Sequence, residues 1–165
     1  MNNPPDTRVA AIDLLAIAGF QAAYIRAIDQ DQLERWPDFF ADPCFYRITT
    51  AENAAAGLEA GIVYATSQGM LRDRITALRR ANIYEDHHYR HIVGLPAILE
   101  ANMLGVVKAE TPFIVARIMH DGTTTLFVTG VYRDEFITAA GALKLARRDV
   151  ILDSSRIDTL LAIPL

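Results

Sequence analysis

The sequence is short of cysteine, of lysine and of long apolar runs. Its 165 residues include one cysteine, Cys44, so no intrachain disulfide can form and a cysteine-rich zinc site is excluded. A chain so poor in cysteine is typical of a reducing, cytoplasmic setting. No stretch approaches the roughly 18 uninterrupted apolar residues that a membrane span needs. The first seven residues also lack the basic start of a signal peptide. We therefore expect no membrane partner.

Several enzyme motifs are missing as well. No GxGxxG, GxSxG or P-loop lysine motif occurs, so dinucleotide, serine-hydrolase and nucleotide-binding functions have no support. A Rieske iron–sulfur cluster needs two cysteines and two histidines, so this chain alone cannot hold one. The net charge is −4, and the 14 arginines and 2 lysines form no basic patch. Nucleic acid is therefore not an expected partner.

The length fits one domain, which we place at residues 9–165, after a flexible arm at residues 1–8. Apolar residues recur at helical spacing through residues 9–28. A second helix is expected from Asp31, which forms a capping-box pattern with Glu34. Ser67 is expected to cap a third helix that reaches Asn82, with Met70, Ile75 and Leu78 facing inward. Residues 45–49 read as a strand, and residues 51–60 as a loop.

The second half follows the two-residue period of strands. The Asp121–Gly122 pair predicts a two-residue hairpin turn, Ala140–Gly141 predicts another turn, and Gly130 predicts a bulge or bend. Pro96 marks an edge or a bulge. The expected strands are residues 89–99, 106–120, 123–136 and 143–153. Three helices followed by an antiparallel meander predict an α+β fold, in which a strongly curved sheet wraps around the helices as a cone.

A cluster of histidines invites a metal-site hypothesis. His87 and His91 share one face of a strand, with His88 and Arg90 on the other face. Two ligands four residues apart converge on a helix, but on a strand they lie roughly 13 Å apart. We therefore expect no metal site here. Arg90 and His91 are better interpreted as interface residues that donate hydrogen bonds to a partner subunit.

A cone can enclose a pocket, which leaves an alternative function open. Tyr24, Asp38, Tyr46 and His91 could line such a pocket and carry proton transfer in a stand-alone isomerase, dehydratase or polyketide-cyclase-like enzyme. A ligand carrier without chemistry is a further possibility. The simpler interpretation is that Tyr24 and Tyr46 are core aromatics whose hydroxyls find a partner.

Charged residues in the last two long strands form a second candidate for subunit contacts. Arg148 and Asp153 alternate with apolar residues near the end of the chain, and Arg133 and Asp134 lie on the neighbouring expected strand. These four side chains could form a salt-bridged face between subunits. Exposed cross-strand ion pairs would contribute little stability by themselves.

At these residues the sequence resembles the small subunits of aromatic-ring-hydroxylating dioxygenases. The resemblance spans nearly the whole chain after the arm. Gly94 departs from it, because the family commonly has Asn there. The matching positions are Tyr24, Asp29, Trp36, Asp42, Tyr46, Arg74, Arg90-His91-Ile92-Val93, Gly130-x-Tyr132-x-Asp134 and Arg148-x-Val150-x-Leu152-Asp153. The match is closest to small subunits that serve aromatic carboxylates, notably terephthalate, through residues 61–64, 81–85 and 158–165.

The resemblance implies a nuclear-transport-factor-like cone and a structural rather than catalytic role. It implies a large (alpha) subunit that holds the Rieske [2Fe–2S] cluster and a mononuclear Fe(II). It also implies a trimer of small subunits within an assembly of three large and three small subunits, and an NADH-dependent reductase that supplies electrons. Under this hypothesis the chain has no cofactor, metal or catalytic residue of its own.

Overall fold

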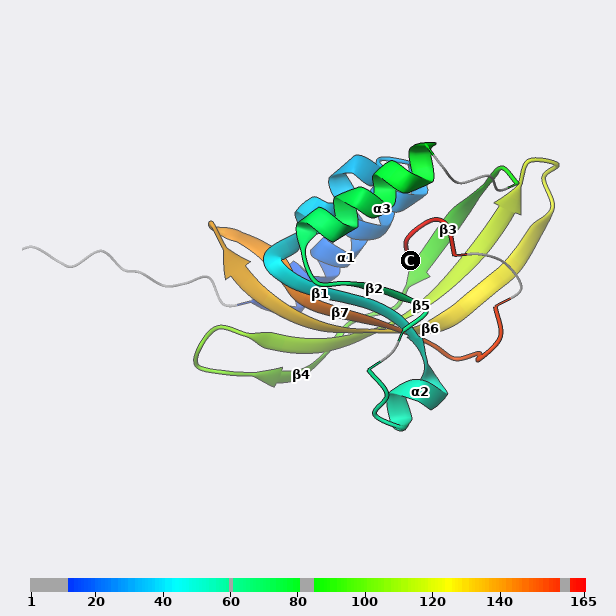
Figure 1. Ribbon diagram of the computed structural model, residues 1–165. Helices are drawn as coiled ribbons and strands as arrows, with labels where there is room; N and C mark the ends of the chain where they lie inside the picture. The colour runs from blue at the N-terminus through cyan, green and yellow to red at the C-terminus, as the bar shows by residue number, and fades with distance from the viewer. Residues whose placement is uncertain (1–11, 60, 81–84, 158–160) are drawn as a thin grey trace, which may run out of the picture.

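A strongly curved sheet holds two long helices against its inner face (Figure 1). The computed structural model describes residues 12–59, 61–80, 85–157 and 161–165. The expected arm at residues 1–8, and the predicted end of the third helix at Asn82, lie outside them. The helices are α1 (Leu14–Asp29), the 3₁₀ helix η1 (Leu33–Phe39), α2 (Ala51–Ala55) and α3 (Gln68–Arg80). The strands are β1 (Phe40–Thr50), β2 (Val63–Ala65), β3 (His87–Val93), β4 (Ala97–Ala101), β5 (Val107–Met119), β6 (Thr124–Ala139) and β7 (Ala142–Leu152).

The strand order confirms the meander but adds one parallel pair. The sheet runs β2-β1-β7-β6-β5-β3, and β4 pairs with the free part of the β5 edge. Strands β5, β6 and β7 are successive antiparallel neighbours, as expected. Strand β1 runs parallel to β7, so the prediction of a wholly antiparallel sheet is wrong and the sheet is mixed. This pairing is possible because α3 and the intervening strands separate β1 from β7 in the chain and supply the long crossover that parallel strands need.

Both predicted hairpins form. At Ala140–Gly141 the two central residues have positive φ angles of 51° and 76°, which is the two-residue turn that suits the twist of paired strands. The turn at Asp121–Gly122 is one residue longer than predicted. There the Met119 N–H donates to the Thr123 carbonyl at 2.9 Å, and Gly122 takes a φ of 87°. Three residues therefore form that loop, and glycine occupies its left-handed position.

Gly130 allows β6 to pack closely against β7 and does not form a bulge. It lies within β6 and pairs with Phe113 on one side and Leu152 on the other. A Cβ atom at this position would lie 2.1 Å from the Ile151 carbonyl oxygen. The prediction of a bulge is therefore wrong, because the irregular registers of β6 fall elsewhere, between Val115 and Ala116 of β5 and between Glu135 and Phe136.

The helices expected over residues 9–28 and from Ser67 form as α1 and α3, but α1 begins later than expected, at Leu14. The Asp13 carboxylate accepts from the Ala16 N–H at 2.8 Å and caps α1, and the Ser67 hydroxyl accepts from the Met70 N–H at 3.2 Å and caps α3. Ile75 and Leu78 of α3 are buried, as predicted. Met70 is 39% exposed instead, because Leu71 takes the inward position on the first turn of α3.

The predicted capping box at Asp31 is wrong. Asp31 has a φ of 56°, and its carboxylate accepts two hydrogen bonds from Arg79 of α3, at 2.8 and 2.9 Å. Glu34 also binds Arg79, at 2.8 Å. A contact between distant segments therefore uses both carboxylates that the pattern assigned to a local cap. The expected loop after residue 50 begins instead with α2, where Thr50 accepts from the Asn53 N–H.

The predicted strand at residues 89–99 is two strands. It breaks at residues 94–96 into β3 and β4, and every residue of β4 is exposed. None of the helices in the described part of the chain is long and apolar enough to cross a membrane.

Candidate functional site

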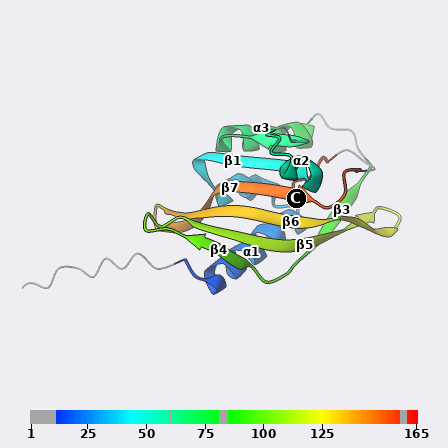
Figure 2. The ribbon, with the colours of Figure 1, turned by 90° about the horizontal axis from the view of Figure 1, so that it is seen from below.

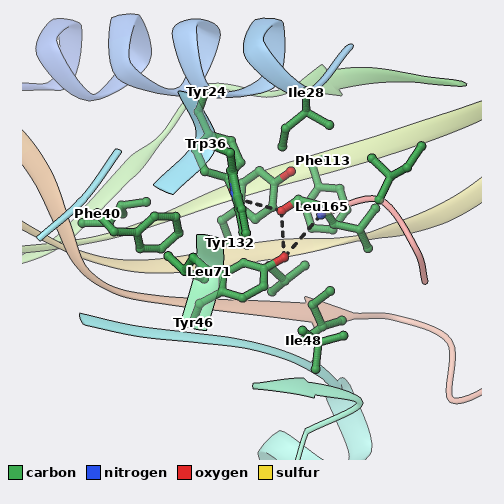
Figure 3. Packing of buried hydrophobic residues seen from close by; sticks show 14 of the residues in the cluster. Tyr24, Ile28, Trp36, Phe40, Tyr46, Ile48, Leu71, Phe113, Tyr132 and Leu165 are labelled. Carbon is green, nitrogen blue, oxygen red and sulfur yellow. Dashed lines mark hydrogen bonds between the residues drawn. The ribbon is translucent and has the colours of Figure 1, made fainter. Parts of the chain in front are cut away.

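The interior of the cone is filled with aromatic side chains (Figure 3). Tyr24, Trp36, Tyr46 and Tyr132 all have zero solvent exposure. Trp36 and Tyr46 pack edge to face with ring centroids 5.0 Å apart, and Tyr132 stacks on Phe113 at 4.3 Å. In an enzyme of this shape, a substrate would need the space that these rings occupy.

Residues 161–165 complete the filling. The hydroxyls of Tyr24 and Tyr46 both donate to the Leu165 carbonyl oxygen, at 2.9 and 3.2 Å (Figure 3). Trp36 Nε1 donates to the Tyr24 hydroxyl at 2.7 Å. Arg74 holds the segment from the side by donating to the Leu161 carbonyl at 2.6 Å. Burial raises the pKa of both tyrosines above 10, so their hydroxyls stay protonated and act as donors.

The four residues of the pocket hypothesis do not converge. Tyr24 and Tyr46 meet at Leu165, as described above. Asp38 lies at the surface with 64% of its side chain exposed, and its carboxylate accepts from Arg72 at 3.2 Å. His91 is buried on β3, where its Nδ1 lies 2.6 Å from a carboxylate oxygen of Asp29. The tyrosine hydroxyls therefore bind the main chain of this protein, which fits the simpler interpretation of core aromatics with satisfied hydroxyls.

Arg148 forms the centre of a buried polar network. Its Nε and Nη2 atoms each donate to the Asp134 carboxylate at 2.8 Å. Its guanidinium lies between the rings of Tyr24 and Tyr132, 4.0 and 4.1 Å from their centroids. Burial alone would lower the pKa of Arg148, but the adjacent Asp134 carboxylate outweighs it and the pKa is raised. The Arg148 guanidinium is therefore held in its charged form.

Gln21 joins this network, and the sequence analysis missed it. Its side-chain amide donates to Asp134 at 2.8 Å and to Thr111 at 3.1 Å, and its oxygen accepts from Arg148. Gln21 has zero exposure and lies within the apolar stripe of α1. That position was the available signal, because a polar residue in a buried stripe needs a polar partner. The hydroxyl of Tyr132 is also buried beside this network, but it has no hydrogen-bond partner among the described residues.

The histidine-rich strand places no ligand cluster. Residues 87–93 form the strand β3, which ends earlier than the predicted strand, and Tyr89 and His91 face inward while His88 and Arg90 are exposed. Among the described residues, no three His, Cys, Asp or Glu side chains are positioned to hold a metal ion.

The outer face of the sheet carries an ordered row of charges. Glu110, Arg133, Asp149 and Arg47 are successive partners across β5, β6, β7 and β1. Arg133 donates to Glu110 at 2.8 Å, and Arg47 donates to Asp149 at 2.6 Å. Figure 2 looks onto these four strands from below. Opposite charges therefore alternate along this row, but only its Glu110–Arg133 half is partly exposed, because Asp149 and Arg47 are buried at 7% and 8% exposure.

Beside that row lies an apolar area. Ile92 and Ile114 are cross-strand partners with 63% and 44% exposure, and the exposed Pro112 pairs with Val131. An apolar centre with a charged border is the usual composition of a protein interface.

The six interface candidates divide into two groups. Arg90, Arg133 and Asp153 are exposed and border the outer face, so a contact with another subunit stays a prediction for them. His91, Asp134 and Arg148 are buried inside the chain, with fully buried side chains. These three bind Asp29, Gln21 or one another and hold the domain together.

Comparison with known proteins identifies the family to which this fold belongs. The family model of the ring hydroxylating beta subunit matches residues 24–159. The chain belongs to this family. It is thus a small subunit of the aromatic-ring dioxygenase type, as its resemblance indicated. The terephthalate 1,2-dioxygenase terminal oxygenase component subunit beta 1 of Comamonas sp. is 52% identical over 154 residues, 93% of this chain and 99% of that protein.

Another relative and a solved structure match this chain as members of the same family. The anthranilate 1,2-dioxygenase small subunit of Burkholderia cepacia is 42% identical over 145 residues, 88% of this chain and 89% of that protein. A crystal structure from Novosphingobium aromaticivorans, described as the beta subunit of an aromatic-ring-hydroxylating dioxygenase, superposes with a TM-score of 0.85 at 40% identity, covering 96% of this chain and all of that one. The predicted cone fold is therefore confirmed. The interior tyrosines and the Arg148–Asp134 pair lie within the range that the family model matches.

Proposed function

We propose that this chain is the structural small subunit of a Rieske-type dioxygenase that hydroxylates an aromatic carboxylate, with terephthalate as the first substrate to test. Its partner is a large subunit that holds the [2Fe–2S] cluster and the mononuclear iron. Three large and three small subunits form the assembly in the cytoplasm, and a reductase delivers electrons from NADH to the large subunit.

The filled interior of the cone is the observation that supports a structural role. Tyr24, Tyr46 and Trp36 are engaged with one another and with Leu165, so the interior side chains stabilise the domain instead of facing a substrate. The outer face supports the role in assembly, because it combines exposed isoleucines with charged residues that can pair with another chain. Terephthalate is proposed because the 52% identical relative is named for it.

Co-expression tests this proposal. The chain is produced with and without a terephthalate-dioxygenase large subunit, and iron content, co-purification and oxygen uptake with terephthalate are measured. We expect the small subunit to co-purify with an iron-containing, active large subunit, and to carry neither iron nor activity when purified alone. Stoichiometric iron or turnover in the isolated chain would contradict the structural role, and a failure to co-purify would contradict the proposed partner.

A matched pair of variants locates the assembly surface. Arg133 and Arg72 are both half-exposed arginines in surface ion pairs, with side-chain exposures of 57% and 55%. Arg133 lies on the outer face, whereas Arg72 lies on α3. We expect Arg133→Glu to reduce co-purification of the other subunits, and Arg72→Glu to leave it unchanged. Equal retention by the two variants would exclude the outer face at Arg133 from the assembly contact.

A further inference from the structure

We propose that the tip of the β4–β5 arm of one copy binds an apolar hollow beside β3 of a second copy. The arm consists of β4, the turn at residues 102–106 and the start of β5. This inference rests on the proposed function, in which several small subunits share one assembly, and it names the two surfaces that join them.

The arm presents apolar side chains to solvent. Met103 is 103% exposed, Leu104 is 89% exposed and Leu99 is 60% exposed. In Figure 1 the arm lies on the side of the sheet away from α1 and α3, so neither helix covers it. Exposed apolar groups of this size, gathered at one place, mark a site of protein association. Methionine suits such a contact because its side chain adapts to the shape of a partner surface.

The tip is held in one conformation. The Asn102 side-chain oxygen accepts from the backbone N–H groups of Leu104 and Val106, both at 3.0 Å. The Gly105 N–H donates to the Asn102 carbonyl at 3.1 Å, and Gly105 takes a φ of 79°. A tip that is already ordered loses less conformational entropy on binding, which favours a stable contact.

A hollow on the same molecule has matching chemistry. It measures about 250 Å³, and its lining is apolar: Ile92, Val93, Gly94, Pro112, Phe113 and Ile114. Gly94 contributes no side chain that could fill it, and its N–H donates to the Pro112 carbonyl at 2.8 Å. The volume is several times the ~30 Å³ that one water occupies in the liquid, so it has room for a methionine or leucine side chain.

The tip cannot reach the hollow of its own chain. Val107 follows the tip, and Pro112 is the residue of the same continuous strand β5 that borders the hollow on the side of the tip. Five residues of extended strand separate them by roughly 16 Å. The contact therefore joins two copies through different surfaces, each copy giving a tip and receiving one. Contacts of this kind close into a ring when the rotation between copies allows it, which agrees with the proposed trimer.

Disulfide crosslinking tests the contact. The double variant Met103→Cys with Ile92→Cys is oxidised at pH 7.5, both as the isolated chain and co-expressed with the large subunit. The natural Cys44 does not interfere, because it is buried and burial raises the pKa of its thiol to about 11. We expect covalent dimers and trimers of the small subunit. The control is Met103→Cys with Leu58→Cys, since Leu58 is 52% exposed and lies outside the hollow. We expect at least tenfold less crosslinking from this control.

A second pair of variants measures the contact without oxidation. Because Met103 is fully exposed, Met103→Asp should leave the melting temperature unchanged and weaken self-association at least tenfold. Leu58→Asp should change neither quantity.

Three results would overturn the inference: equal crosslinking in the two cysteine pairs, a disulfide between the cysteine introduced at position 103 and the large subunit, or unchanged self-association of Met103→Asp. If native mass spectrometry still finds several small subunits in the assembly, such a result leaves the proposed function intact. If the unmodified chain failed to co-purify with the large subunit, the proposed function would be contradicted. The crosslinks of the isolated chain would still test the contact between two small subunits.

Discussion

The two tyrosines that sandwich Arg148 differ in one respect that stability measurements can isolate. Both rings are fully buried and lie about equally far from the guanidinium, at 4.0 and 4.1 Å. The Tyr24 hydroxyl accepts from Trp36 and donates to Leu165, whereas the Tyr132 hydroxyl has no partner among the described residues. Tyr24→Phe and Tyr132→Phe remove the same atom and keep the same ring stacking.

The expected effects have opposite signs. Tyr24→Phe loses one net hydrogen bond, about 0.5–1.5 kcal/mol, and leaves the buried Trp36 N–H unpaired, which costs about 1–3 kcal/mol. We expect a loss of roughly 2–4 kcal/mol in the free energy of unfolding. Tyr132→Phe removes a buried hydroxyl that gained no hydrogen bond on folding. Its effect should lie between zero and a gain of roughly 1–3 kcal/mol.

Urea unfolding of the isolated chain, followed by far-UV circular dichroism, measures both variants against the unmodified protein. For a domain of this size, 1 kcal/mol corresponds to roughly 2–4 °C in melting temperature, so thermal scans give an independent value. If Tyr132→Phe destabilised the domain as much as Tyr24→Phe, the hydrogen-bond account of the interior would be refuted. A Tyr24→Phe variant as stable as the unmodified chain would refute it equally.

Three further predictions concern the same interior. Arg148→Ala or Asp134→Ala leaves a buried charge unpaired and should cost about 3–5 kcal/mol in urea unfolding, with the double variant costing less than the sum; additive losses would contradict a direct pair. Burial raises the pKa of Tyr24, Tyr46 and Tyr132 above the ordinary 10.0, so stability should be complete below pH 10 and fall above it, as the unfolded chain loses its protons first. Each tyrosine that stays protonated in the folded protein should contribute a slope of up to about 1.4 kcal/mol per pH unit, so Tyr132→Phe should make the pH dependence shallower. Gly130→Ala should destabilise by about 1–3 kcal/mol because its Cβ meets the Ile151 carbonyl, whereas Gly69→Ala, with its nearest neighbour at 3.6 Å, should gain about 0.5–1 kcal/mol; equal melting temperatures would contradict this.

Local sequence signals predicted the elements whose cause is local. The turn at Ala140–Gly141 and the Ser67 cap depend on residues within a few positions, and both form as expected. The capping box at Asp31 failed because Arg79, 48 residues away, binds its carboxylate more favourably than the backbone does. The parallel pairing of β1 with β7 leaves no mark in the period of either strand, so only the assembled sheet reveals it.

The candidate site was predicted only in part for a similar reason. The residue types at Arg148 and Asp134 indicated an ion pair, but the pattern could not tell an internal pair from one between subunits. Residue types also do not reveal that Leu165 returns to the interior and binds Tyr24 and Tyr46, which lie 141 and 119 positions away in the chain. The exposed Arg133 and the buried Asp134 are adjacent in sequence, and the two faces of one strand separate them.

The Arg148–Asp134 pair has a consequence for how β7 finds its place against β6. The two residues are direct cross-strand partners. If β7 slid by a single position, Arg148 would turn to the outer face, and Arg147 and Asp149 would both point into the interior beside Asp134, so two buried carboxylates would share one arginine. A misaligned sheet would therefore be penalised at once by a stranded charge, whereas an all-apolar interior would tolerate the slip more easily. The buried ion pair thus favours the observed alignment of β7 against β6 over an alignment that is shifted by one residue.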